Sequence, residues 1–185
     1  MTSKSLFTSL MVSSFIIMLS AININTHAVM PMKAPFEALT KDTKKQISCL
    51  AENIYFEAAN EPRDGKIAVA FVTLNRLRTG NYADTICGVV TQKTNGTCQF
   101  SWYCDPKIIR QRLTIRETPL YNEILDLSTY VYLNLHKMKD VTNGATFYHA
   151  DYVNPGWNLK KETKIGKHIF YKRKGDQIDR NKRII

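Results

Sequence analysis

The sequence lacks the features that mark several large protein classes. Beyond the N-terminal region there is no long apolar run, and the longest uncharged stretch is Thr94 to Cys104. Four cysteines and eight glycines among 185 residues exclude a disulfide-dense miniature scaffold and a collagen-like chain. There is no internal repeat and no low-complexity tract. With 44% hydrophobic and 23% charged residues, the composition is typical of one ordinary globular domain.

Acidic residues are missing from the N-terminal region. Residues 1–28 carry one lysine, Lys4, and no acid, and the stretch from Leu6 to Ala21 is dominated by apolar residues. This pattern predicts a secretory signal peptide over 1–28 with cleavage after Ala28, which places the protein in the periplasm, cell wall or extracellular space. An uncleaved membrane anchor is the alternative, although the apolar stretch is shorter than the ~20 residues that a spanning helix prefers.

Acidic residues are also outnumbered elsewhere. The chain has 26 Lys and Arg against 16 Asp and Glu, a net charge of +10, and residues 158–185 alone hold ten basic and three acidic residues. Such a charge favours negatively charged partners, among which nucleic acid, anionic lipid and acidic wall polymer all qualify. The alternative is a solvated basic tail without a specific role.

The sequence has no CxxC motif and no histidine beside a cysteine pair, which argues against a zinc site. In an exported protein four cysteines are more often paired as disulfides. Cys98 and Cys104 bracket a short loop, so the preferred pairing among three possibilities is Cys98 with Cys104 and Cys49 with Cys87.

Hydrophobic periodicity predicts a mainly helical α+β protein. Apolar residues recur at spacings of three and four over 43–60, 64–78 and 118–137, which predicts three helices, although β-branched residues leave a buried strand open for the second. The segment 84–101 is predicted to be loop with short strand pieces, and 145–174 to hold two or three short strands. We expect an extended lead-in over 29–42, one domain over 43–172 and a basic tail over 173–185.

One carboxylate lies at the edge of the first predicted helix. Glu57 follows Leu50 by seven residues and therefore borders the apolar stripe, whereas Glu52 is predicted to point the other way. Partial burial among Tyr55 and Phe56 would raise the pKa of Glu57 and suit it to general acid catalysis. The alternative is an edge residue that reaches solvent or pairs with Arg63.

A series of motifs surrounds Glu57. It consists of a Tyr-x-Glu-Ala-x-x-Glu-Pro stretch, a Gly, an apolar helix ending in Leu-Asn-Arg, a Gly-Val-Val segment, and two late aromatic pieces. The chain thereby strongly resembles the SleB/CwlJ-type cell-wall hydrolases over about residues 49–171. It departs from the family pattern at Ala59-Asn60, where Arg-Gly is common. The matching residues are Tyr55, Glu57, Ala58, Glu61, Pro62, Gly65, Leu74, Asn75, Arg76, Gly88, Val89, Val90, Ala145, Phe147, Tyr148, Ile165, Gly166, His168 and Phe170.

The resemblance implies a lysozyme-like fold and cleavage of peptidoglycan between N-acetylmuramic acid and N-acetylglucosamine, with Glu57 as the catalytic acid. A lytic transglycosylase would need no second carboxylate, whereas a hydrolase normally uses two. The candidates for a second acid are Glu61, Asp64, Asp84 and Asp105.

Further residues are expected to support Glu57 or to bind substrate. Because sugar rings present apolar faces, the aromatic loop between Cys98 and Cys104 is the preferred binding surface, and Trp157 is a weaker candidate. The loop aromatics could instead form a small satellite core, and Asn75 and Arg76 could be buried braces. The supporting and binding candidates are Glu61, Asn75, Arg76, Gln99, Phe100, Ser101, Trp102 and Tyr148.

Two other functions fit parts of the sequence. His149, Asp151 and His168 are zinc-ligand types and would suit a zinc amidase, but their spacing matches no common zinc pattern. A non-catalytic cationic module that binds wall polymer is the second alternative, and no nucleic-acid motif accompanies the charge. The preferred interpretation is a monomeric enzyme without metal or cofactor that acts on peptidoglycan glycan strands, does not bind nucleic acid, and does not insert into the membrane after signal cleavage.

Overall fold

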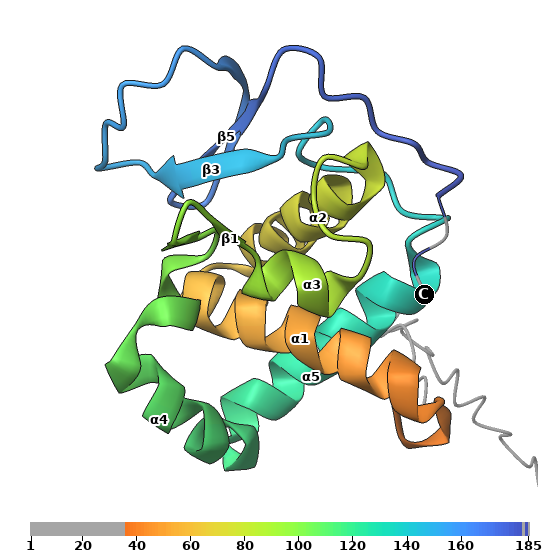
Figure 1. The fold of residues 1–185 in the computed structure, drawn as a ribbon. Helices are drawn as coiled ribbons and strands as arrows, with labels where there is room; N and C mark the ends of the chain where they lie inside the picture. The colour runs from red at the N-terminus through yellow and green to blue at the C-terminus, as the bar shows by residue number, and fades with distance from the viewer. Residues whose placement is uncertain (1–35, 183, 185) are drawn as a thin grey trace, which may run out of the picture. The chain divides into compact units, whose positions relative to one another are not determined.

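Three long helices and a small late sheet are the main elements of the described chain (Figure 1). The computed structural model describes residues 36–182 and 184, so the predicted signal peptide and most of the predicted lead-in lie outside the described residues. The elements are η1 (Phe36–Ala38), α1 (Lys41–Ala58), α2 (Arg63–Thr79), α3 (Ile86–Thr91), β1 (Lys93–Thr94), β2 (Thr97–Cys98), η2 (Ser101–Cys104), α4 (Pro106–Thr114), η3 (Ile115–Glu117), α5 (Pro119–Asn134), β3 (Phe147–Ala150), β4 (Lys160–Ile165) and β5 (His168–Lys172).

The three predicted helices are confirmed as α1, α2 and α5, with their ends shifted by at most three residues. Local signals define their starts, since the side chains of Thr40 and Thr118 accept hydrogen bonds from the backbone of the first turns of α1 and α5. Helix α2 stops at Gly80, whose φ of 72° is a left-handed conformation that glycine adopts without strain.

Helix α2 is the centre of the fold. Its residues from Ile67 to Leu77 are all buried, so this part of the helix has no polar face toward solvent. A fully buried segment rich in β-branched residues is also compatible with a buried strand, which is why the sequence left that alternative open. One side packs on α1, and the other packs on the sheet, where Ala68 and Val72 contact Phe170 of β5. The helix therefore joins the helical core to the sheet.

The late sheet is antiparallel, with strand order β3-β5-β4. Tyr148 of β3 lies opposite Phe170, which is fully buried against α2, and Phe147 lies opposite Tyr171. Because side chains alternate across a strand, Tyr148 points toward the helices and Phe147 toward the other face. Strand β3 forms one edge of the sheet.

Two short helices lie where no helix was predicted. Helix α3 falls inside the predicted loop 84–101, and it forms because Thr85 caps Gly88 N–H at 2.9 Å while Ile86 and Val89 enter the core. Helix α4 begins at Pro106 after Asp105, whose carboxylate accepts the Lys107 N–H. Both helices are too short for periodicity to reveal them, and caps define their starts.

The expected outward direction of Glu52 is wrong. Its side chain is buried, with 1% of the residue exposed, and Arg112 Nη2 donates to Oε2 at 2.6 Å. Arg116 donates to the other carboxylate oxygen from Nε at 3.2 Å. The cause is the segment α4–η3, which covers this side of α1 and brings both arginines to it.

The cysteines pair as preferred. The disulfide Cys49–Cys87 connects α1 with α3, and Cys98–Cys104 connects β2 with the end of η2. The first bridge fixes α3 beside the helix that carries Glu57.

The segment after β5 is attached to the domain at several points. Asp176 is buried and accepts hydrogen bonds from Thr146 Oγ1 at 2.6 Å and Asn81 Nδ2 at 3.2 Å. Farther along, Asp179 N–H donates to the Arg78 carbonyl, and the Ile184 carbonyl accepts from Tyr132. Within the part of the chain described here, we find no helix with the length and apolarity needed to span a membrane.

Candidate active site

Glu57 lies in the last turn of α1 and is held from a distant part of the chain. The hydroxyl of Tyr148 on β3 donates a hydrogen bond to Glu57 Oε2 at 2.9 Å, across 91 positions of sequence. The geometry therefore pairs a half-buried carboxyl group with a phenol that approaches from the sheet. Sequence analysis placed Tyr148 among the supporting or binding candidates without assigning it a partner, and strand alternation alone could not reveal this contact.

The surroundings of Glu57 shift its acidity. Burial raises the pKa of Glu57 above its usual value, because a charged carboxylate loses its hydration there. The Tyr148 hydrogen bond and the positive charge of Arg76 both lower this pKa, but burial has the larger effect. The pKa of Tyr148 is well above its usual value through burial and the nearby Glu57 charge, so Tyr148 stays a hydrogen-bond donor.

Arg76 of α2 supplies the positive charge beneath this pair. It is only 5% exposed, and its Nε donates to the Thr146 carbonyl at 2.8 Å, just before β3. Its guanidinium also lies over the rings of Phe100 at 4.7 Å and Phe147 at 5.8 Å. Arg76 therefore joins α2, the loop that carries Phe100, and the start of the strand that carries Tyr148.

Asn75 is a buried brace. Its Nδ2 donates to Asp140 Oδ2 at 2.9 Å and to the Ala145 carbonyl at 3.1 Å. These bonds fix the turn that leads into β3, so Asn75 acts on the position of Tyr148 and not on Glu57 itself.

Glu61 stabilises a different contact. Its buried carboxylate accepts the Lys167 N–H at 2.9 Å, in the turn between β4 and β5. A Cβ atom at Gly166 would overlap Glu61 Oε2, so the close approach of this turn requires glycine. Glu61 thus anchors the β4–β5 hairpin to the corner between α1 and α2.

The other candidate acids are engaged elsewhere or exposed. Asp84 pairs with Lys182 at 2.8 Å, and Asp105 caps α4. Asp64 is exposed in the first turn of α2. None of these carboxylates has a hydrogen bond to Glu57 in the described part of the chain.

Two of the three aromatic residues in the disulfide loop are buried. Phe100 and Trp102 are each 3% exposed and belong to the main core, so their predicted role as an open sugar-binding surface is wrong. Trp102 stacks on Phe56 at 4.6 Å and donates from Nε1 to Asn53 at 2.9 Å. The neighbouring Ser101 is exposed and Gln99 half-buried, so both can still meet a substrate.

The three residues of the late segment that could ligate zinc, His149, Asp151 and His168, do not form one site. His149 Nε2 shares a hydrogen bond with the Tyr171 hydroxyl at 3.0 Å, and Asp151 pairs with Lys164 at 2.8 Å. His168 is buried with its ring against Tyr148. Residues 36–182 and 184 contain no group of three or more His, Cys, Asp or Glu side chains arranged to hold a metal ion.

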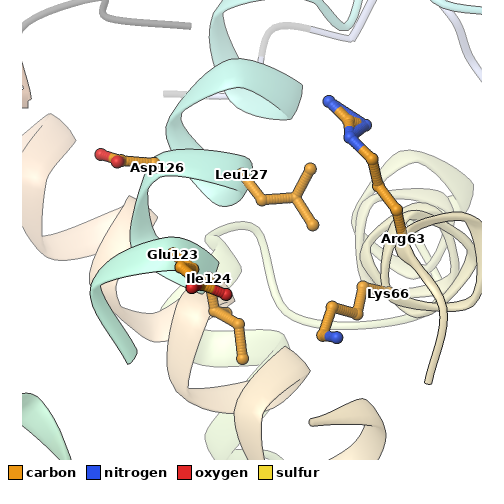
Figure 2. Close-up of a pocket in the computed structure, with 6 residues that line it drawn as sticks. All are labelled: Arg63, Lys66, Glu123, Ile124, Asp126 and Leu127. Carbon is orange, nitrogen blue, oxygen red and sulfur yellow. The ribbon is translucent and has the colours of Figure 1, made fainter. Parts of the chain in front are cut away.

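A cavity of about 340 Å³ lies between the start of α2 and α5 (Figure 2). Arg63 and Lys66 reach it from α2, opposite α5, and it contains none of the predicted site residues. It is therefore separate from the Glu57 pair. The α5 residues that line it are Glu123, Ile124, Asp126 and Leu127.

The family model for the Cell Wall Hydrolase family matches residues 60–171. The chain belongs to this family. The match includes Tyr148, Asn75 and Arg76 and starts three residues after Glu57. This membership supports the SleB/CwlJ-type resemblance of the motifs.

Two curated relatives of the chain are spore cortex-lytic enzymes. The one from Halalkalibacterium halodurans is 28% identical over 127 residues, which cover 67% of this chain and 34% of the relative. The one from Oceanobacillus iheyensis is 28% identical over 133 residues, which cover 70% of this chain and 42% of the relative. The chain therefore spans less than half the length of these two relatives.

Two solved structures share the fold. The catalytic domain of the germination-specific lytic transglycosylase SleB from Bacillus anthracis aligns with a TM-score of 0.52 at 23% identity, over 73% of this chain and 98% of that domain. The catalytic domain of Bacillus cereus SleB aligns with a TM-score of 0.50 at 23% identity, over 70% and 91%. The predicted mainly helical, lysozyme-like α+β fold is confirmed.

Proposed function

We propose that the protein is a peptidoglycan-cleaving lytic transglycosylase that uses Glu57 as its single acid and base. The observation that carries this proposal is the half-buried Glu57 carboxyl group, with its raised pKa and its hydrogen bond from Tyr148. Family membership and the likeness to SleB support the class of substrate, a glycan strand of alternating N-acetylglucosamine and N-acetylmuramic acid.

In the first step protonated Glu57 acts as the acid. Tyr148 donates to Oε2, so Oε2 is an acceptor and the carboxyl proton belongs on Oε1. From Oε1 the proton passes to the glycosidic oxygen of the leaving N-acetylglucosamine while the bond to muramoyl C1 breaks. An oxocarbenium-like state develops at C1, and Tyr148 and Arg76 stabilise the new carboxylate.

In the second step the Glu57 carboxylate acts as the base. It takes the proton from the muramoyl 6-hydroxyl while O6 bonds to C1, which gives a 1,6-anhydro sugar and restores protonated Glu57. No water and no second carboxylate enter this sequence. It therefore fits a site in which Glu61, Asp84 and Asp105 are engaged elsewhere.

The proposal includes the cellular setting. We place the enzyme outside the cytoplasm, exported through removal of residues 1–28 and acting on the wall as a monomer without metal or cofactor. The positive net charge supports work on an acidic wall.

The deciding experiment is digestion of purified peptidoglycan by the protein and its Glu57→Gln variant, with the fragments identified by mass spectrometry. We expect anhydro-muramoyl ends from the protein and a loss of at least about a thousandfold in Glu57→Gln, because the acid and base are removed together. Glu117→Gln, at an exposed position, is the matched control and should keep full activity.

Other products would contradict the proposal in defined ways. Reducing muramoyl ends would mean hydrolysis and a second catalytic carboxylate. Free stem peptides would mean an amidase. Glycan cleavage that survives in Glu57→Gln would remove Glu57 from the mechanism.

A further inference from the structure

Trp157 stands out among the exposed side chains. The residue is 41% exposed, although its indole contacts three other rings. The ring centroids of Phe147, His149 and Tyr171 lie 5.7, 5.6 and 6.0 Å from it. Trp157 is therefore a fixed aromatic surface that remains open to solvent.

Neighbouring structure fixes these rings in place. Phe147 and His149 alternate along β3 on the face opposite Tyr148, and Tyr171 lies across from Phe147 on β5. His149 stacks on Tyr171 at 5.1 Å and shares a hydrogen bond with its hydroxyl. Trp157 follows a tight turn in which the Asn154 side chain accepts the Gly156 N–H and Gly156 adopts a φ of 65°.

The aromatic surface and the Glu57 site are connected through β3, which forms one edge of the sheet. Adjacent residues of this strand face the two sides, Tyr148 toward Glu57 and Phe147 toward Trp157. Arg76 connects them, because the centroid of the Phe147 ring lies 5.8 Å from its guanidinium and its charge acts on Glu57. Two adjacent residues of one strand therefore contact the proposed acid and the exposed indole.

The charge beside the surface indicates what kind of polymer fits. The Arg173 guanidinium lies 4.9 Å from the centroid of the Phe147 ring and, with Lys172 and Lys174, lines a cavity of about 780 Å³. The two acids of that cavity are already engaged, Glu162 by Lys160 and Asp176 by Asn81 and Thr146. Open cations next to an exposed indole suit a glycan with carboxylate substituents better than a purely apolar partner.

We propose that Trp157 is a glycan-stacking residue that, backed by Phe147, His149 and Tyr171, positions the peptidoglycan strand next to Glu57. The inference rests on the proposed function, because it takes the same glycan as its ligand. An indole offers a flat apolar face to the C–H side of a sugar ring, and the backing rings keep it rigid, so little conformational entropy is lost on binding.

Binding can be measured apart from catalysis in the Glu57→Gln background. We expect that adding Trp157→Ala weakens co-sedimentation with purified peptidoglycan about three- to tenfold, the usual size of one aromatic contact. Trp157→Phe should restore most of the binding, because a flat ring remains. Tyr152→Ala is the matched control: Tyr152 lies in the same connection and is 85% exposed, and its removal should change binding less than about twofold.

Fluorescence gives a second readout in the protein without these substitutions. The chain has two tryptophans, and Trp102 is buried, so quenching by acrylamide reports mainly on Trp157. Saturation with soluble peptidoglycan fragments should protect this signal and shift it to shorter wavelength. In the active enzyme Trp157→Ala should raise KM several-fold with little change in kcat.

The inference is overturned if Trp157→Ala binds like its parent, if acrylamide quenching is unchanged at saturation, or if the surface is covered by a second copy of the chain. The last result would appear as Trp157-dependent dimerisation in sedimentation velocity. The two proposals fail separately. Trp157-dependent binding without cleavage would contradict only the transglycosylase, and anhydro products at unchanged KM in Trp157→Ala would contradict only the stacking role.

Discussion

At the scale of single residues, Glu57 combines opposing influences on one carboxyl group. Burial favours the protonated form, while Tyr148 and Arg76 favour the carboxylate. A carboxyl group that donates a proton and then accepts one must be able to adopt both its protonated and its ionised form. The balance between burial and these two neighbours therefore sets the pH range in which the proposed mechanism works.

Tyr148→Phe tests this balance. Loss of the donor removes an influence that lowers the Glu57 pKa, so the pKa should rise further and the alkaline limb of the pH–rate profile should move to higher pH. The maximal rate should fall about tenfold, since the carboxylate loses its hydrogen bond. The check is release of soluble fragments across pH, with Tyr152→Phe as the control. A limb that moves to lower pH would contradict the assignment.

The same pKa predicts a stability effect. Because folding raises the Glu57 pKa, the folded protein binds more protons, and its stability falls as pH rises from the unfolded-state pKa, about 4, through the folded-state pKa. Glu57→Gln has no charge to bury. We expect its Tm to equal that of the parent near pH 4 and to exceed it near pH 8, as measured by calorimetry. Equal values at both pH values would show that burial has no such effect.

At the scale of elements, two disulfides close loops of different length. Cys49–Cys87 spans 38 positions and Cys98–Cys104 spans 6. Loop-closure entropy predicts a loss of about 4 kcal/mol for replacing the first pair by serine and about 2 kcal/mol for the second. Urea unfolding of the two double variants, compared with the oxidised parent, measures both. A larger cost for the short loop would contradict the entropic explanation.

The Glu52 ion pairs connect α1 with α4 and η3. Replacing both Arg112 and Arg116 by methionine leaves a buried carboxylate without partners and should cost about 3–5 kcal/mol of unfolding free energy. Adding Glu52→Gln to that variant should recover part of the loss, because the buried charge is removed. Urea unfolding of these variants and of Glu52→Gln alone gives the coupling energy. A double variant as stable as the parent would mean that the pairs contribute nothing.

These elements also show what a sequence of this kind can reveal. Periodicity predicted α1, α2 and α5 because each repeats its apolar stripe over four or more turns. Helices α3 and α4 depend on single capping residues, Thr85 and Asp105, and have little stripe to detect. The burial of Glu52 could not be predicted without α4 and η3, whose residues Arg112 and Arg116 create the site for its charge.

The candidate site divides in the same way. Glu57 could be predicted as a site residue from its place at the edge of the apolar stripe of a helix and from the motif around it. The contact with Tyr148 depends on how the sheet docks on α2, which no local pattern encodes. The role of the disulfide loop was predicted wrongly for a related reason. Aromatic residues such as Phe100 and Trp102 suit both a sugar-binding surface and a packed core, and only tertiary packing shows that they belong to the core.

At the scale of the whole molecule, positive charge collects after β4. Neutralising Lys172, Arg173 and Lys174 together with glutamine should weaken retention on intact, anionic cell wall several-fold at low salt. The difference should shrink as sodium chloride rises from about 50 to 500 mM, because salt screens exposed charges. Co-sedimentation measures both effects.

The control changes the same amount of charge elsewhere. Lys41, Lys45 and Lys137 are exposed, and their replacement by glutamine should leave retention within about twofold of the parent. Equal losses in both triple variants would assign wall affinity to net charge and not to the region after β4.

The long sequence separation between Glu57 and Tyr148 has a consequence for the timing of activity. A chain that leaves the ribosome or a translocation channel N-terminus first carries its acid well before the last third has emerged. Until β3 docks, that carboxyl group is hydrated, has ordinary acidity and is ionised at neutral pH. On the proposed mechanism the nascent chain therefore lacks its protonated acid until the final strands are in place.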